Sequence, residues 1–185
     1  MKKSFAITIL SSALYVNAAT YNISNQESNS YFKAMSDVVF FGSDEIIGIN
    51  KKLTGTLTYE NNKIENGEII IFTSGFNTQN SMRDKHIQEI LTTQKHSKIS
   101  FFIQKQFEKN SQQFIQGILK INDIEKSQTI PVQIKLSGNI LLLQGKFNIK
   151  YKDFDIEKPT FGGFIKRANE TIEIGGKFIF EQDNK

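Results

Sequence analysis

Hydrophobic and polar residues alternate along most of the chain after residue 50. In the segment 53–59, Leu53, Leu57 and Tyr59 are separated by threonines, so an extended chain there has one apolar face and one face of hydroxyl groups. The same period of two recurs in five further segments, at 99–104, 115–121, 130–136, 147–151 and 172–180. Because this period is typical of strands with one buried face, the pattern predicts an all-β protein with an antiparallel sheet.

Turn-forming residues lie between these segments. Pairs such as Asn61-Asn62 and Asn122-Asp123 are typical of tight connections between neighbouring strands. Between Asn80 and Thr93 the repeat changes, because apolar residues there fall at helical spacing after a residue that can cap a helix. The pattern therefore predicts about eight strands, closed as a barrel or stacked as a sandwich, with one short helix over the wall or across a mouth.

The composition narrows the chemistry that is open to the chain. It has 185 residues, no cysteine and two histidines, His86 and His96. Without cysteine there can be no disulfide, thiolate metal site or cysteine nucleophile, and two imidazoles are little material for a metal centre. We therefore expect no enzyme activity, no catalytic cofactor and no bound metal.

The first residues have the pattern of an export signal. Two lysines precede an apolar run at 5–16, and small residues follow it. A charged start, a short apolar run and a small-residue end are the marks of a secretory signal peptide. We expect cleavage after Ala18 or Ala19, leaving a single domain at 19–185 in the periplasm or outside the cell. The apolar run is too short to cross a bilayer, so no transmembrane span is expected.

The charge of the chain gives no sign of a nucleic-acid partner. The formal net charge is +4, and the lysines are scattered along the sequence rather than clustered. Binding to phosphate backbones needs a concentrated positive face. We therefore expect no nucleic-acid binding.

Several segments together resemble one known family of proteins. In order and spacing they are similar to the pattern of the YceI-like family of exported polyisoprenoid-binding proteins, over roughly residues 20–182. The segments are Gly75-Phe76-Asn77-Thr78, Arg83-Asp84-Lys85-His86-Ile87, Lys98-Ile99-Ser100-Phe101, Gly117-Ile118-Leu119-Lys120-Ile121 and Thr129-Ile130-Pro131-Val132. Two positions depart from the family pattern: Asn29 stands where a histidine is usual before Ser30, and Lys150 lies where an arginine is usual.

The resemblance implies an extended, lipocalin-like barrel of eight antiparallel strands, with the helix after the fourth strand. It also implies a long apolar channel that holds an isoprenoid, a quinone tail or a fatty-acyl compound. Gly55, Gly117 and Gly176 on the apolar faces favour an open channel, since a missing inward side chain leaves volume; the alternative is that they relieve strand twist. The residues expected to line the channel are Phe32, Leu57, Phe101, Ile103, Leu119, Phe147, Ile149, Phe154, Phe164 and Phe178.

Polar residues near the helix are candidates for contact with a lipid head group. They are Ser30, Arg83, Asp84 and His86. The alternative for the last three is a structural role, in which hydrogen bonds of Arg83 and Asp84 and a hydrogen-bonded His86 fix the helix to the barrel. A metal site at Asp84 and His86 would need further ligands from distant residues, and a hydrolytic triad cannot form within one helical turn.

The function predicted from the sequence is non-enzymatic binding or transport of a small lipid. Two other classes remain open: a filled barrel that binds an envelope protein through an outward patch at Phe102 or Phe107, and a small metal-dependent enzyme that uses Asp84 and His86. The sequence also leaves open whether the protein pairs into a homodimer.

Overall fold

The computed structural model describes residues 18–24, 27–38, 42–158, 160–161 and 166–183. The predicted signal segment before Ala18 and the predicted channel residue Phe164 lie outside these ranges. Within the described ranges, none of the helices has the length and apolar character that crossing a bilayer requires.

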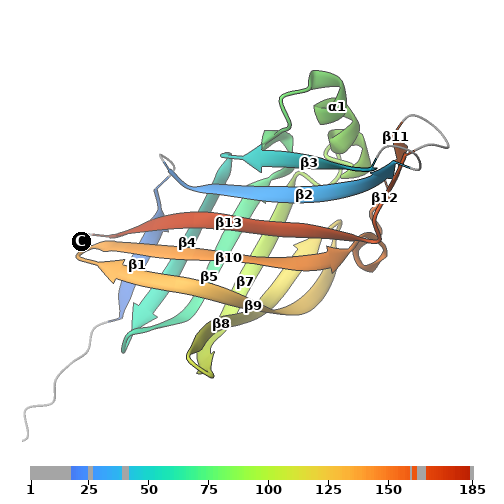
Figure 1. Ribbon diagram of the computed structural model, residues 1–185. Coiled ribbons are helices and arrows are strands. Elements are labelled where there is room, and N and C mark those ends of the chain that lie inside the picture. Colours follow the sequence, from blue (N-terminus) through green and yellow to red (C-terminus); the bar gives the residue numbers. More distant parts are fainter. Residues whose placement is uncertain (1–17, 25–26, 39–41, 159, 162–165, 184–185) are drawn as a thin grey trace, which may run out of the picture.

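Antiparallel strands make up most of the described chain (Figure 1). The strands of the first half are β1 (Ala19–Ile23), β2 (Asn29–Val38), β3 (Gly42–Asn50), β4 (Leu53–Glu60), β5 (Lys63–Phe72) and β6 (Phe76–Asn77). Those of the second half are β7 (Lys98–Lys109), β8 (Gln112–Ile121), β9 (Ile124–Ser137), β10 (Ile140–Lys150), β11 (Thr160–Phe161), β12 (Lys166–Ala168) and β13 (Thr171–Gln182). One α-helix, α1 (Ser81–Ile90), and two 3₁₀ turns, η1 (Thr73–Gly75) and η2 (Tyr151–Phe154), complete the described fold.

Eight of these strands close into a barrel in the order β1, β4, β5, β7, β8, β9, β10 and β13. The short strand β1 closes the ring because it pairs with β4 on one side and with the last residues of β13 on the other. Each strand of this ring pairs with a neighbour on both sides, which reduces the edge available for strand-to-strand aggregation. The predicted eight-stranded antiparallel barrel is confirmed.

The other end of the barrel has a different wall. There the first half of β13 pairs with β2 instead of β1, with Glu173–Lys177 opposite Asn29–Lys33. Strand β2 continues into the hairpin partner β3, and β3 in turn pairs with β6. The β2–β3 hairpin is thus inserted into the wall at this end, and α1 lies above β3 in Figure 1.

The position of the helix in the strand order was predicted wrongly. Helix α1 follows the sixth strand rather than the fourth. Strand β3 was missed because Gly48 and Asn50 take inward positions, whereas Ile47 and Ile49 are 45% and 47% exposed. Its isoleucines therefore lie on both faces, Ile46 buried and Ile47 and Ile49 exposed, and do not mark one buried face. Strand β6 has only two residues, which is too short for any repeat to show.

The helix begins where the sequence predicted, next to Asn80, and ends three residues before the predicted end at Thr93. The side chain of Asn80 accepts a hydrogen bond from the backbone N–H of Arg83 at 3.0 Å, which is the role of an N-cap residue. Thr92 adopts a φ of 44°, in the left-handed region, so the helical backbone cannot continue through it. The predicted helix of residues 80–93 is in the structure the ten residues Ser81–Ile90.

The hydrophobic core of the described chain consists of two clusters of buried residues. Ile103, Leu141, Phe154 and Phe180 are completely buried in the main cluster. A second, smaller cluster of Phe32, Ala34 and Ile46 joins the β2–β3 hairpin to α1 through partly buried neighbours. Residues of both clusters line the cavities described next.

Candidate functional site

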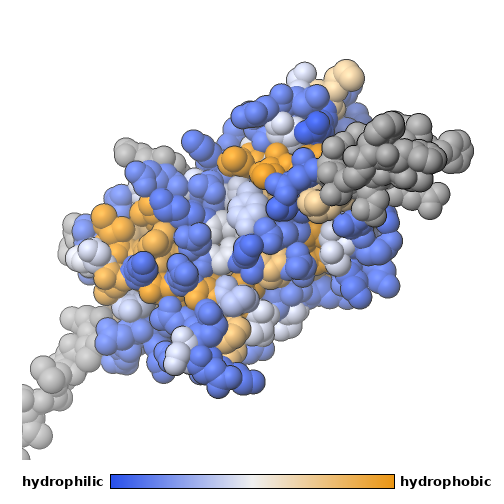
Figure 2. Space-filling view, in the orientation of Figure 1, coloured by the Kyte–Doolittle hydropathy of each residue, from blue (hydrophilic) through white to orange (hydrophobic). Residues whose placement is uncertain are grey.

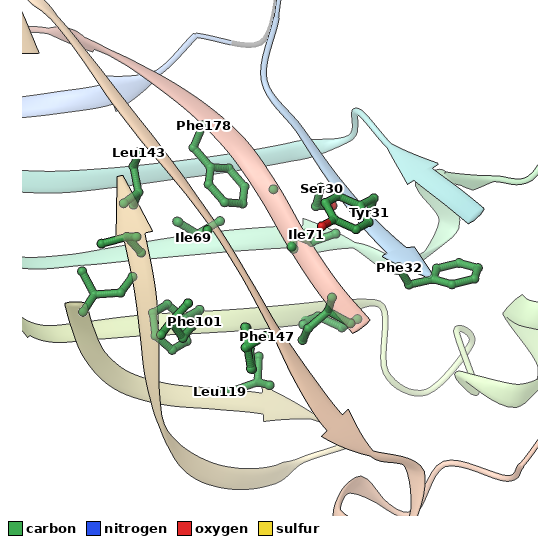
Figure 3. Close-up of a pocket in the computed structure, with 18 of the residues that line it drawn as sticks. Ser30, Tyr31, Phe32, Ile69, Ile71, Phe101, Leu119, Leu143, Phe147 and Phe178 are labelled. Atoms are coloured by element: carbon green, nitrogen blue, oxygen red, sulfur yellow. The ribbon is translucent and has the colours of Figure 1, made fainter. Parts of the chain in front are cut away.

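An apolar cavity of about 110 Å³ lies inside the barrel. Its wall comes from the ring strands β5, β7, β8, β9, β10 and β13 and from β2 and β6, and Figure 3 shows side chains from several of them directed toward the same space. Apart from Ser30 and Tyr31, its lining consists of aliphatic and aromatic residues and glycines. The lining includes Phe32, Ile69, Ile71, Phe101, Leu119, Leu143, Phe147 and Phe178. We call this space the inner cavity.

A second apolar cavity, of about 90 Å³, lies beneath α1. Helix α1 contributes Arg83, His86, Ile87 and Ile90, and the strands contribute mainly aliphatic residues. The helix lies over this space because its apolar residues, spaced three and four apart, face the barrel. We call this space the outer cavity.

The two cavities adjoin each other along the barrel axis. Five residues line both of them: Phe32, Phe76, Ile99, Ile121 and Ile174. The rings of Phe32 and Phe76 meet edge to face, with centroids 5.3 Å apart. The Phe32 ring can take this position because residue 48 is glycine, where an added Cβ would lie 2.1 Å from a ring carbon. The lumen therefore contains two adjoining apolar cavities, and this aromatic pair is part of the boundary between them.

Most of the predicted channel residues lie at these cavities. Phe32 lines both, Phe101, Leu119, Phe147 and Phe178 line the inner cavity, and Ile149 lines the outer one. The remaining three described residues, Leu57, Ile103 and Phe154, are buried in the packed core and line neither cavity.

Two lining residues on β5 were not predicted from the sequence. Ile69 and Ile71 line the inner cavity, but they belong to a run of three isoleucines that hides the period of two. The signal that could have found them is the pairing of this segment with the recognised strand at 53–59 through the turn at 61–62.

The glycines that favoured an open channel do not create it. Gly55 and Gly117 line neither cavity, and at each of them an added Cβ would lie only 2.8 Å from a neighbouring side-chain atom. Gly176 does line the inner cavity, yet a Cβ there would lie 2.3 Å from the Phe178 ring. These glycines admit neighbouring atoms rather than leave open volume, so the reason for expecting an open channel fails although a cavity is present. The cavity is instead the space left between side chains across the lumen.

The four polar candidates do not form one cluster. Ser30 lines the inner cavity, and Arg83 and His86 line the outer one. Asp84 lines neither: its Oδ1 accepts hydrogen bonds from the backbone N–H of Thr78 at 2.8 Å and from the Thr78 hydroxyl at 2.6 Å. His86 is half exposed, with Nδ1 3.6 Å from the Glu89 carboxylate. Asp84 thus has a structural contact that ties α1 to the preceding segment.

Comparison with known proteins identifies the family. The model of the YceI-like domain matches residues 21–178. The chain belongs to the YceI-like family. Solved structures share the fold: BcnA of Burkholderia cenocepacia has a TM-score of 0.71 at 14% identity, with 85% of this chain and 98% of that chain covered. No curated protein sequence matches the chain.

Two further solved structures support the same fold. A polyisoprenoid-binding domain from Saccharophagus degradans, implicated in plant cell wall breakdown, has a TM-score of 0.66 at 12% identity, with 90% of this chain and 100% of that chain covered. The YCEI protein of Campylobacter jejuni has a TM-score of 0.59 at 15% identity, with 75% of this chain and 85% of that chain covered. At these identities the likeness shows the fold alone.

The charged groups of this YceI-like barrel lie mainly on its outside. The Tyr31 hydroxyl donates to Glu173 at 3.1 Å, and Lys146 pairs with the same carboxylate at 3.1 Å. Burial would raise the pKa of Glu173, but hydrogen bonds from Lys146 and Tyr31 outweigh it and the pKa is lowered. At the outer cavity, burial raises the pKa of Tyr151 to about 12, so this phenol is neutral at physiological pH.

The outer surface in Figure 2 is largely hydrophilic, with hydrophobic area over β3 below α1 and also over the left-hand ends of β13 and β10. Phe102, one of the two outward residues considered for binding a protein, is 49% exposed, and Phe107 stacks on Phe114 with ring centroids 5.4 Å apart. Among the residues that the structure describes, no three histidine or carboxylate side chains gather into a set that could hold a metal.

Proposed function

We propose that this YceI-like protein binds the hydrocarbon chain of an isoprenoid, a quinone tail or another long-chain amphiphile without performing chemistry on it. The observation that carries the proposal is the pair of adjoining cavities, whose walls are almost entirely aliphatic and aromatic. The description of the Saccharophagus degradans domain as polyisoprenoid-binding supports it. A cofactor is not part of the proposal.

The energetics of such binding are sufficient without an ionic contact. A tail that buries on the order of 500 Å² of apolar surface gains roughly 12 kcal/mol, at about 25 cal/mol per Å². The loss of motional freedom on association and the ordering of the tail and side chains oppose binding by about 4–15 kcal/mol. Micromolar binding is therefore within reach through burial alone, and such a site discriminates mainly by chain length and width. A chain that fills both cavities must pass the Phe32–Phe76 pair, so these rings have to move when it enters.

Catalysis by Asp84 and His86 is not part of this function because Asp84, the acid of this pair, is hydrogen-bonded to Thr78. The carboxylate oxygen of Asp84 already accepts two hydrogen bonds from Thr78. It lines neither cavity, whereas His86 lines the outer one. An acid–base pair that acts on a bound lipid requires both groups within hydrogen-bond reach of it.

We also propose that the protein works outside the cytoplasm, after removal of residues 1–18. The charged, then apolar, then small-residue pattern of the first segment supports this location. N-terminal sequencing of the protein from its native host should find Ala19 or Thr20 first. Detection of Met1 on the mature chain would contradict export by this route. Pairing into a homodimer stays a prediction, which sedimentation of the purified protein checks.

The binding proposal is tested by enlarging each of two neighbouring leucines to phenylalanine. One of them lines the inner cavity, and the other is the control. Leu143 is buried and lines the inner cavity, while Leu142 is partly exposed on the same strand and lines neither cavity. Leu143→Phe should lower the affinity for farnesol and for palmitate at least tenfold, because the larger ring takes up volume that a tail needs. Leu142→Phe makes the same change outside the barrel and should bind as the wild type does.

Two results would overturn the proposal. The first is a purified protein that carries no lipid by native mass spectrometry and binds neither probe. The second is equal affinity of the Leu143→Phe and Leu142→Phe variants for both probes, with unchanged melting temperatures. In that case the probes bind somewhere other than the lumen.

A further inference from the structure

The hydroxyl of Ser30 is buried beside the inner cavity without a hydrogen-bond partner. Ser30 is 2% exposed and lines the cavity, and no partner for its Oγ is found among the described residues. Ser28, two residues earlier on the chain, is also buried, but its hydroxyl donates to the Ser24 carbonyl at 2.7 Å and accepts from the Ile179 N–H at 2.9 Å. A buried hydroxyl without a partner is unfavourable, so Ser30 is poised to bond with something inside the cavity.

The surroundings of Ser30 select the chemistry of that partner. Within the described part of the chain, no charged side chain lines the inner cavity, and the one other polar side chain there, Tyr31, donates its hydroxyl to Glu173 on the outside. A charged group placed in such a lining would lose its hydration without an opposite charge in return. An uncharged oxygen can enter at much lower cost if it exchanges one hydrogen bond with Ser30.

The charged candidates lie in the other compartment. Arg83 and His86 line the outer cavity under α1, on the far side of the Phe32–Phe76 pair. A ligand whose polar end is anionic would be placed there, with its tail inward. A ligand whose polar end is neutral has its best hydrogen-bonding site at Ser30, with its tail directed toward α1.

We propose that Ser30 binds an uncharged oxygen of the ligand, an alcohol or a carbonyl, within the inner cavity. The polar end of the lipid then lies deep in the barrel, and its hydrocarbon chain passes Phe32 and Phe76 toward the outer cavity. This inference rests on the proposed function and adds the class and the orientation of the ligand.

Three probes with the same chain test the inference: farnesol, the hydrocarbon farnesene and farnesyl phosphate, each measured by displacement of a fluorescent fatty acid. The wild type should bind farnesol most tightly. Ser30→Ala should weaken farnesol binding about tenfold, the worth of one hydrogen bond between neutral groups, and leave farnesene unchanged. Arg83→Gln and His86→Ala change only the wall around the tail and should weaken farnesol binding less than Ser30→Ala does. Leu142→Phe lies outside both cavities and should leave farnesol binding unchanged.

Three results would overturn the inference. Unchanged farnesol affinity in Ser30→Ala would mean that the hydroxyl bonds at most to an ordered water. Tightest binding of farnesyl phosphate, lost in Arg83→Gln, would place the head group in the outer cavity. A lowered melting temperature of the unliganded Ser30→Ala protein, comparable to that of Ser28→Ala, would show that Ser30 has a partner within the fold. If the wild type binds none of the three probes, it is the proposed function that fails.

Discussion

Removal of the Asp84 carboxylate should release α1 from the barrel. Thr78 is buried, and both its backbone N–H and its hydroxyl donate to Asp84 Oδ1, at 2.8 and 2.6 Å. Asp84 also lies in the first turn of the helix, where a negative charge is favourable to the helix dipole. Asp84→Ala therefore leaves a buried N–H and a hydroxyl without an acceptor and removes a favourable charge.

The magnitude follows from these contacts. A hydrogen bond to a charged group contributes about 1.5–3 kcal/mol. Because Asp84 is only partly buried, water can bond to some of the groups that lose their acceptor. We therefore expect the free energy of unfolding to fall by about 2–4 kcal/mol, less than the full contribution of two such bonds. Asp84→Asn keeps an acceptor oxygen without the charge and should lose about half as much. Since α1 covers the outer cavity, the loss should be concentrated in that region.

Hydrogen exchange by mass spectrometry measures this directly. Amides of residues 78–91 should exchange at least tenfold faster in Asp84→Ala, while those of β8 and β10 keep their protection. Glu89→Ala is the matched control, because this helix residue is exposed and lies 3.6 Å from His86; exposed pairs contribute little. Equal protection of residues 78–91 in the Asp84 and Glu89 variants would refute a structural role for Asp84.

Three further outcomes can be checked by chemical denaturation. The free energy of unfolding should fall by about 1–3 kcal/mol in Ser28→Ala, because the Ser28 hydroxyl makes two hydrogen bonds. It should not fall in Ser30→Ala, whose hydroxyl makes none within the described fold. Burial disfavours the ionised form of Tyr151 and raises its pKa from 10.0 to about 12. The free energy of unfolding should therefore be unaffected by this group below pH 10 and fall by roughly 2–3 kcal/mol as the pH rises to 12; Tyr151→Phe should show a shallower decline over that range. The pKa of Glu173 is lowered from 4.5, against the effect of its burial, chiefly by Lys146. The ionised Glu173 carboxylate therefore makes its full contribution to the free energy of unfolding above pH 4.5 and loses it as the pH falls below that value. A Glu173→Gln protein that loses as much stability on acidification as the wild type would contradict this.

The alternation of residues was enough to predict the strands that carry a strong apolar face. Leu53 and Leu57 on β4, and Leu119 and Ile121 on β8, are buried in the order that the period of two requires. This works because the pleat of a strand is local: successive side chains point to opposite faces whatever the strand pairs with. The cap of α1 at Asn80 is local in the same sense.

Local pattern failed where the inward residues are small or polar. Ser30, Gly48 and Asn50 face inward on β2 and β3. At Gly48 the space is occupied by the Phe32 ring, and the Asn50 side chain donates a hydrogen bond to the Phe72 carbonyl at 2.8 Å. The sequence of neither strand alone predicts this contact, since Phe32 belongs to β2 and Gly48 to β3.

The sequence by itself therefore determined which side of each well-patterned strand is buried, and that an antiparallel sheet with one helix would form. Only the tertiary structure decided that Leu57 and Ile103 pack against other side chains while Phe101 and Leu119 border open space. It also decided that Asp84 is bonded to Thr78 while Arg83 and His86 line a cavity. The reason is that the face of a side chain is set by the backbone of its own strand or helix. What that side chain meets across the lumen is set by residues from distant parts of the chain.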